Sequence, residues 1–119
     1  MAAIQKFTDI KAWDLAHAFV LLISEVVKQF PKHEQYCLTS QLWRATVSVA
    51  ANIVEGFYRS TAKERLRFYE ISMSSLEETK YYIILAKDLN YITVDEARSL
   101  YEQANEVGKT LRGWMKHTK

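Results

Sequence analysis

The segment from Tyr36 to Glu70 constrains the fold more than any other part of the chain. It reads YCLTSQLWRATVSVAANIVEGFYRSTAKERLRFYE, a long apolar run, a short polar break and the start of another helix. At helical spacing the run is apolar on two faces, whereas polar residues recur every three or four positions on a third. These polar residues are Gln41, Arg44, Ser48, Asn52, Glu55 and Arg59. A helix with two apolar faces needs several neighbours, so we expect it to lie deeper than the first helix.

Residues that break helices are rare in this chain. Its 119 residues include three Gly and one Pro, which leaves few places for turns and favours long helices. The hydrophobic share of 49% and the charged share of 25% are typical of a folded globular protein. The length fits one hydrophobic core, and we expect a single domain over residues 1–119.

Apolar residues at alternating steps of three and four predict four helices. We expect them at about residues 11–30, 40–58, 62–89 and 94–115. The links between them are short, so consecutive helices should run antiparallel. The sequence therefore predicts an all-α protein, an antiparallel up-down-up-down four-helix bundle.

Polar residues at the predicted helix ends supply start and stop signals. Pro31 disfavours continuation of the first helix, and Asn90 suits the left-handed conformation that ends the third. Side chains just before each helix can accept hydrogen bonds from its first N–H groups. The expected caps are Asp9 or Thr8, Thr39 or Ser40, Thr61 in a capping box with Glu64, and Thr93 in a capping box with Glu96.

Residue types that carry catalysis or bind metals are few and scattered. His17, His33 and His117 fall on different predicted elements, and none has a Glu or His partner at metal-ligand spacing. Cys37, the single cysteine, has no neighbouring His in a nucleophile motif and cannot form an internal disulfide. We expect no metal, no cofactor and no catalytic residue. Without a targeting signal or a membrane-spanning run, a cytoplasmic location is expected.

The polar stripe of the second helix predicts a buried or half-buried network. A carboxylate on a largely apolar helix costs free energy unless a cation pairs with it, and Arg44 or Arg59 can pair with Glu55. We expect Arg44, Asn52 and Glu55 to form a structural polar network between helices or to set the register of subunits. A contact with a ligand or nucleic acid, or an enzyme site at a subunit junction, is the alternative.

The run RSTAKERLR gathers basic residues around the start of the third helix. They are Arg59, Lys63, Arg65 and Arg67. The helix dipole disfavours cations at this end, and a bound phosphate would compensate because free backbone N–H groups and basic side chains converge on it. The alternative is a solvated helix start at which Glu64 offsets part of the charge. The formal net charge of +2 is too small to decide between the two.

Aromatic and apolar bulk gathers near the chain ends. Trp114 and Met115, together with Trp13, place large side chains at one end of the predicted bundle. Such bulk suits a subunit interface, and closure of the core explains it equally well.

Several short motifs carry a resemblance to a known family. They are Phe30-Pro31-Lys32, Leu38-Thr39-Ser40-Gln41-Leu42, Arg44-Ala45, Ser48, Ala51-Asn52-Ile53, Glu55-Gly56 and Ser75-Leu76. On these motifs the chain resembles the four-helix-bundle family encoded by intervening sequences within bacterial large-subunit (23S) ribosomal RNA genes. The resemblance spans residues 30–92 and continues more loosely through both outer helices. The chain departs from the family at Cys37 and Asn90, where many relatives have Gly, and at Trp43, where a basic residue is common.

This resemblance implies a cytosolic bundle that assembles as a ring-like homopentamer with no established enzymatic activity. A more distant similarity is to the accessory protein of diversity-generating retroelements, a pentameric bundle that binds nucleic acid and a reverse transcriptase. By analogy we expect this protein to bind structured RNA, because a ring of five copies multiplies a weak basic surface. The alternative is a protein-interaction adaptor that binds no nucleic acid.

Overall fold

A computed structural model describes residues 3–119 of the chain. Four α-helices account for most of it: α1 (Lys11–Val26), α2 (Leu38–Phe57), α3 (Ala62–Asp88) and α4 (Val94–Lys116). The connections contain three single turns of 3-10 helix: η1 (Phe7–Asp9), η2 (Val27–Gln29) and η3 (Lys32–Glu34). No strand occurs within the part of the chain that is described.

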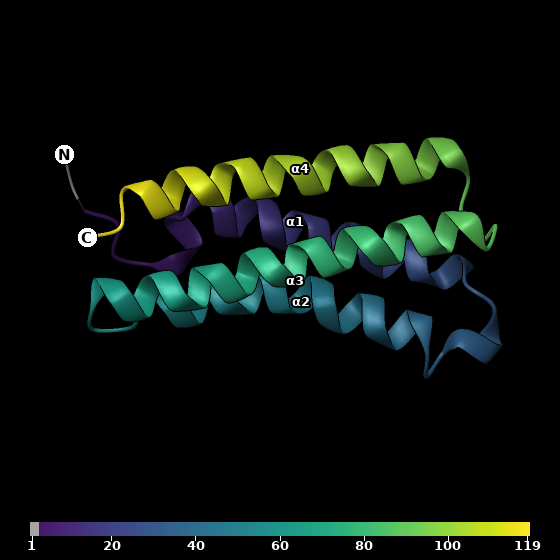
Figure 1. The fold of residues 1–119 in the computed structure, drawn as a ribbon, viewed down its shortest axis with the longest axis horizontal. Helices are drawn as coiled ribbons and strands as arrows, with labels where there is room; N and C mark the ends of the chain where they lie inside the picture. The colour runs from purple at the N-terminus through teal and green to yellow at the C-terminus, as the bar shows by residue number, and fades with distance from the viewer. Residues whose placement is uncertain (1–2) are drawn as a thin grey trace.

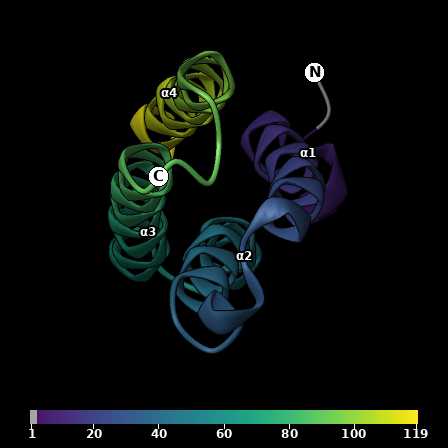
Figure 2. The ribbon, with the colours of Figure 1, turned by 90° about the vertical axis from the view of Figure 1, so that its right-hand side faces the viewer.

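The four helices form an antiparallel bundle. Figure 1 shows each helix running opposite to the one before it, so the link between α2 and α3 lies at the same end as both termini. Seen from the other end, the helices occupy the corners of a four-sided arrangement in the order α1, α2, α3, α4 (Figure 2). The bundle measures 46 × 25 × 18 Å, and α2 and α3 are its most closely packed pair. The predicted all-α fold class is confirmed.

The predicted apolar seams form the core. On α4 every seam position from Ala97 to Leu111 is buried, and Trp114 is half-buried. The largest fully buried aliphatic side chains come from all four helices and from the residue before α1: Ile10, Ile23, Leu42, Ile53, Leu76, Ile83 and Leu111. Burial of each such side chain contributes roughly 1.5–3 kcal/mol. The three-and-four spacing therefore identified the core because it reflects the geometry of helix packing.

The predicted caps of the first two helices are wrong, although α1 begins at Lys11 as predicted and α2 begins two residues early. The residue before α1 is Ile10, whose side chain makes no capping bond, because the η1 turn occupies Thr8 and Asp9. Helix α2 begins at Leu38, so Thr39 and Ser40 lie inside it. Its first N–H is satisfied from outside the helix: the backbone N–H of Leu38 donates to Oε1 of Glu34 at 3.2 Å.

The other helix ends follow the prediction more closely. Oγ1 of Thr93 accepts from the N–H of Glu96 at 3.0 Å, and the Glu96 carboxylate accepts from the N–H of Thr93, which completes a capping box. At α3 only the first half is formed, with Oγ1 of Thr61 accepting from the N–H of Glu64. Asn90 has a φ of 64°, the left-handed conformation predicted for it. Helix α1 ends at Val26, earlier than predicted, and the η2 turn extends it to Gln29.

Helix α2 is more buried than α1, as predicted: five of its 20 residues are exposed, against six of the 16 in α1. It occupies a corner of the bundle as the other helices do (Figure 2). One apolar face is buried, but on the second face Trp43 is 40% exposed and Val47 and Val54 are only half-buried. A four-helix bundle gives each helix two neighbours, so α2 does not bury both of its apolar faces completely within one chain. The second face is left for solvent or for another molecule.

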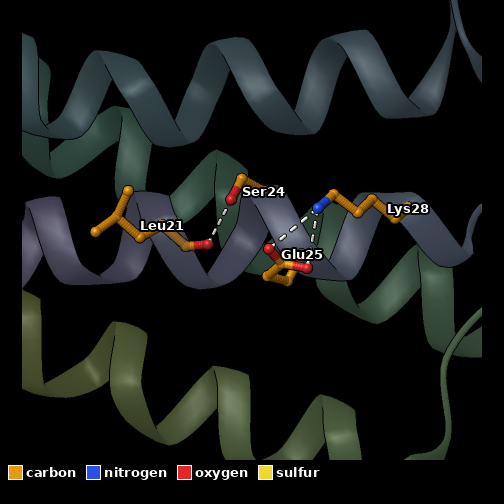
Figure 3. Close-up of polar contacts among 4 residues, drawn as sticks. All are labelled: Leu21, Ser24, Glu25 and Lys28. Carbon is orange, nitrogen blue, oxygen red and sulfur yellow. Dashed lines mark hydrogen bonds and ion pairs between the residues drawn. The ribbon is translucent and has the colours of Figure 1, made fainter.

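The outer face of α1 is mostly polar. Nζ of Lys28 lies 3.1 Å from the Glu25 carboxylate, and Oγ of Ser24 donates to the backbone oxygen of Leu21 at 2.6 Å (Figure 3). The Leu21 side chain is exposed on this face. Across residues 3–119, no helix has the length and apolar character needed to cross a membrane.

Candidate nucleic-acid interface

Asn52 belongs to a polar seam between α2 and α3. Its Nδ2 donates to the backbone oxygen of Ser48 at 2.8 Å and to Oγ of Ser48 at 2.9 Å. The hydroxyls of Ser48 and Ser75 lie 2.9 Å apart and join the two helices. Deeper in the seam, the buried hydroxyl of Ser72 donates to the backbone oxygen of Val49 at 2.6 Å. Small hydroxyl side chains allow the helices to approach closely while each polar group is satisfied.

Glu55 and Arg44 do not join Asn52. Glu55 is exposed and forms an ion pair with Arg59, one turn further on. Arg44 is also exposed, and within residues 3–119 it makes no ion pair. Because Glu55 is exposed in a single chain, its carboxylate would cost little free energy even without a partner. The structure brings together Glu55 with Arg59, and Asn52 with the two serines.

Apolar periodicity alone does not reveal that hydroxyl side chains of α3 bond to α2. Ser72, Ser75 and Thr79 are spaced by three and four residues and lie between the apolar seam positions. Ser72 and Thr79 are fully buried. Small hydroxyl residues at core spacing are the sequence signal that would have located this seam.

Two of the four predicted basic residues lie over one aromatic ring near the start of α3, and a third lies one turn away along the helix. The guanidinium carbon of Arg59 is 4.9 Å from the centre of the Phe68 ring, and that of Arg67 is 6.0 Å away. Lys63 is one turn before Arg67, and both line a shallow groove of about 630 Å³. We call Arg59, Lys63, Arg67 and Phe68 the α3 basic cluster.

Arg65 points away from this cluster. One of its guanidinium nitrogens donates to the backbone oxygen of Arg59 at 3.0 Å, and the other donates to the backbone oxygen of Lys119. It lies beside Tyr69 at the end of the bundle, in a different pocket. The four basic residues therefore divide into a group of three and a single residue with a local structural role.

Carboxylates balance part of the charge around the α3 basic cluster. Glu55 pairs with Arg59, and Glu64 and Glu70 line the same groove as Lys63 and Arg67. One of the free N–H groups at the start of α3 is already bonded to Thr61. A phosphate at this position would meet cations, free N–H groups and carboxylates together, so the local attraction of one chain is modest.

A second polar cluster, which the sequence did not suggest, lies at the other end of the bundle. Oε2 of Glu34 accepts from the Tyr91 hydroxyl at 2.7 Å, while Oε1 accepts from the N–H of Leu38. The Tyr91 hydrogen bond is the main reason that the pKa of Glu34 lies below its usual value, with the Leu38 N–H contributing. The same bond raises the pKa of Tyr91. Nε2 of His33 is 3.4 Å from the Tyr91 hydroxyl.

No cluster in the described part of the chain has the composition of a metal site. His, Cys, Asp and Glu residues nowhere gather in groups of three or more that could hold an ion there. The polar seam joins α2 to α3, and the start of α3 carries both cations and carboxylates at the surface. The protein is thus a four-helix bundle with a group of exposed cations at the start of α3.

Comparison with known proteins assigns the bundle to a family. Residues 8–113 match the family model described as 23S rRNA-intervening sequence protein, and the chain belongs to this family. A similar solved structure is a protein of unknown function from the S23 ribosomal protein family of Bacteroides thetaiotaomicron VPI-5482. The two share 23% sequence identity with a TM-score of 0.81, over 88% of this chain and 98% of that one. No curated protein matches the chain.

The comparisons support a shared fold and leave the activity open. The resemblance to the intervening-sequence family is confirmed. The solved relative is described as having unknown function, and neither description names a reaction. The more distant similarity to the accessory protein of diversity-generating retroelements stays a prediction.

Proposed function

We propose that this protein is a non-catalytic, cytoplasmic helical scaffold that associates with copies of itself, as a pentamer, and binds structured RNA. The observation that carries the proposal is the α3 basic cluster, in which Arg59 and Arg67 flank the half-buried Phe68 ring and Lys63 lies one turn away. Exposed cations contact phosphates, and the planar guanidinium groups that lie over the ring offer surfaces on which an unpaired base can stack.

Binding by one copy should be weak. The carboxylates of Glu55, Glu64 and Glu70 offset much of the local positive charge, and the whole chain carries only +2. Several copies around a ring would contact one folded RNA at several points, so each further contact occurs at high effective concentration. Self-association and RNA binding are therefore linked in this proposal.

The groove between α3 and α4 supports self-association. It has a volume of about 310 Å³ and is lined by the exposed side chains of Ile84, Val94 and Tyr101. Val94 is 59% exposed and is the most exposed of the three. Lys87 and Arg98 lie at its edges. An apolar centre with a charged rim is typical of a protein interface.

RNA binding is tested by removing two cations of the α3 basic cluster. In Lys63→Ala with Arg67→Ala, we expect affinity for a structured ribosomal RNA fragment to fall, and the slope of log K against log salt to flatten by roughly 0.7–0.9 for each lost phosphate contact. The matched control is Lys28→Ala with Lys32→Ala, which removes two charges at the opposite end of the bundle. Equal affinities for the two double variants, with assembly intact, would exclude the cluster as the RNA contact.

Self-association is tested by light scattering. Val94→Glu with Tyr101→Glu places two charges in the apolar groove, and we expect a monomer where the wild type is an oligomer. The control is Ser99→Glu with Gln103→Glu, which adds the same charge to α4 beside α1. A wild-type monomer at micromolar concentration would contradict the scaffold proposal.

The second candidate function is a protein-interaction adaptor, and the same groove favours it. In that case a different protein covers Ile84, Val94 and Tyr101, and the α3 basic cluster is only a solvated helix start. Salt separates the two functions, because phosphate contacts weaken steeply with salt whereas an apolar interface does not. If the affinity for an RNA fragment were the same at low and high salt, phosphate contacts would be excluded and the scaffold proposal would be contradicted.

A further inference from the structure

A pocket of about 410 Å³ lies at the end of the bundle that holds the link between α2 and α3. Three helices contribute to it, with Phe57 from α2, Arg65 and Tyr69 from α3, and Trp114 from α4. Its outer wall is formed by Ala3 and Ile4 and by residues 117–119, which lie outside the four helices. The α3 basic cluster does not line this pocket.

Two buried polar groups in this pocket have no hydrogen-bond partner among residues 3–119. They are the hydroxyl of Tyr69 and Nε1 of Trp114. Tyr69 is completely buried, so water does not replace the missing partner. The Trp114 indole lowers the pKa of Tyr69 as a nearby donor, less than burial raises it, but neither atom has a partner with hydrogen-bond geometry. Burial raises the pKa of Tyr69, so the phenol stays protonated and remains a donor at neutral pH. Leaving such groups unsatisfied opposes folding.

Packing explains the ring of Tyr69 but not its hydroxyl. A Cβ on Gly56 would lie 2.7 Å from Cε1 of Tyr69, so the ring rests directly on the backbone of α2. A phenylalanine would make the same contact without an unsatisfied polar atom. The hydroxyl is therefore the part of this side chain that points to a missing partner.

Arg65 adds a charged donor to the same pocket. One guanidinium nitrogen is held by the backbone oxygen of Arg59, which fixes the orientation of the group. The other already donates to an oxygen acceptor, the backbone oxygen of Lys119. The pocket therefore has three kinds of donor: the Tyr69 hydroxyl, the Trp114 indole N–H and the Arg65 guanidinium. Its walls at Phe57 and Ile4 are apolar.

We propose that this pocket binds a small organic monocarboxylate with an apolar body. The carboxylate accepts hydrogen bonds from the Tyr69 hydroxyl, Nε1 of Trp114 and Arg65, and takes the place of the Lys119 oxygen. The apolar body packs against Phe57 and Ile4. One guanidinium matches the single charge of a carboxylate, and its nitrogen that faces Lys119 gives a directional, charge-assisted hydrogen bond. This site is independent of the proposed RNA contact.

Phenylacetate is the probe, and the indole N–H signal of Trp114 is the readout. In a ¹H–¹⁵N NMR titration, we expect this signal, assigned with Trp114→Phe, to shift and saturate while the signals of Trp13 and Trp43 stay in place. Inorganic phosphate at the same concentration should leave the Trp114 signal unchanged. Absence of a saturable shift with phenylacetate, or an equal shift with phosphate, would overturn the proposal.

The Tyr69→Phe variant tests the hydroxyl directly. We expect a higher melting temperature without ligand, because an unsatisfied buried group is removed, together with phenylacetate binding weakened about tenfold or more. Tyr81→Phe is the matched control, since Tyr81 is 57% exposed, and it should change neither quantity. A lower melting temperature for Tyr69→Phe would show that the hydroxyl is already satisfied, and wild-type affinity in this variant would equally contradict the proposal.

Discussion

Gly56 is the position at which α2 tolerates no side chain. An added Cβ would lie 2.7 Å from Cε1 of Tyr69 and 3.1 Å from the backbone oxygen of Arg65. Both contacts are shorter than ordinary van der Waals separation, and the second involves backbone, which yields less readily than a side chain. The close approach of α2 and α3 at this end of the bundle therefore depends on a glycine.

We expect Gly56→Ala to destabilise the protein by about 1–3 kcal/mol, as overpacking of a core does. Gly113→Ala is the matched control. No atom lies within 4 Å of a Cβ at Gly113, and alanine is the better helix former, so this variant should be more stable by about 0.5–1 kcal/mol. Urea unfolding measures both. Equal effects of the two substitutions would refute the steric account of Gly56.

Glu34 is the residue through which pH should act on the loop before α2. Its side chain is only 15% exposed, and its carboxylate accepts from both Leu38 and Tyr91. The pKa of Glu34 is lowered in the folded state, so this carboxylate stabilises the fold above its ordinary pKa of about 4.3 and the effect is lost as pH falls through the lower folded value. The pKa of Tyr91 is raised by the same hydrogen bond, so this bond is lost only above a pH of about 10, when the phenol loses its proton.

The Glu34→Gln variant should therefore be less stable than the wild type at pH 7, and the difference should narrow below a pH of about 4. Chemical unfolding at pH 7 and near pH 3 measures this difference. Glu106→Gln is the control, because Glu106 is exposed on α4 and should show no such pH dependence. A difference between wild type and Glu34→Gln that stays constant with pH would exclude the proposed role of the carboxylate.

Two helix starts of similar sequence differ in how completely they are capped. At α4, Thr93 and Glu96 satisfy each other's backbone N–H groups, and Nε2 of Gln29 also donates to the Glu96 carboxylate at 3.1 Å. That contact ties the end of η2 to the start of α4. At α3, Thr61 forms a single capping bond. The same sequence motif therefore contributes differently to the two helices.

We expect Thr93→Ala to cost more stability than Thr61→Ala, with the first near the upper part of the usual range of about 0.5–2 kcal/mol. The reason is that loss of Thr93 also releases Glu96, whereas loss of Thr61 removes one bond. Thermal unfolding of the two single variants measures the order. If Thr61→Ala lowered the free energy of unfolding by as much as Thr93→Ala, the complete capping box would not be more stabilising than the half box.

Helices and their seams were predictable because their period follows from helix geometry alone. The cap of α2 was not predictable, because it is the Glu34 carboxylate, four residues before Leu38, whose position depends on the η3 turn. Likewise, the four basic residues of RSTAKERLR are close in sequence, yet the direction of each side chain separates Arg65 from the other three. Contacts such as that of Glu34 with Tyr91 join distant parts of the chain, and no local pattern reveals them.

The whole molecule leaves apolar side chains exposed on more than one side. Leu21 lies on α1, Trp43 on α2, and Val94 with Tyr101 in the groove between α3 and α4. The bundle is narrow, with dimensions of 46 × 25 × 18 Å, so a large share of each helix remains at the surface. Exposed apolar groups on several faces fit a molecule with more than one neighbour.

If these faces are covered by further copies, stability should depend on protein concentration. We expect the melting temperature of the wild type to rise with concentration, because association stabilises the folded chain by mass action. The melting temperature of Val94→Glu with Tyr101→Glu should stay constant over the same range. Differential scanning calorimetry across a hundredfold dilution series compares them. A wild-type melting temperature that is independent of concentration would contradict self-association in this range.

The close packing of α2 against α3 also has a consequence for how the chain acquires its structure. These helices are adjacent in sequence and joined by residues 58–61, so their contacts close a short loop at small entropic cost. We infer that the α2–α3 hairpin forms early during folding and opens last. Amide hydrogens of Val49 and Ser72 should then exchange with deuterium more slowly than those of Val20 or Leu100, and the outer helices should separate from a hairpin that is still intact.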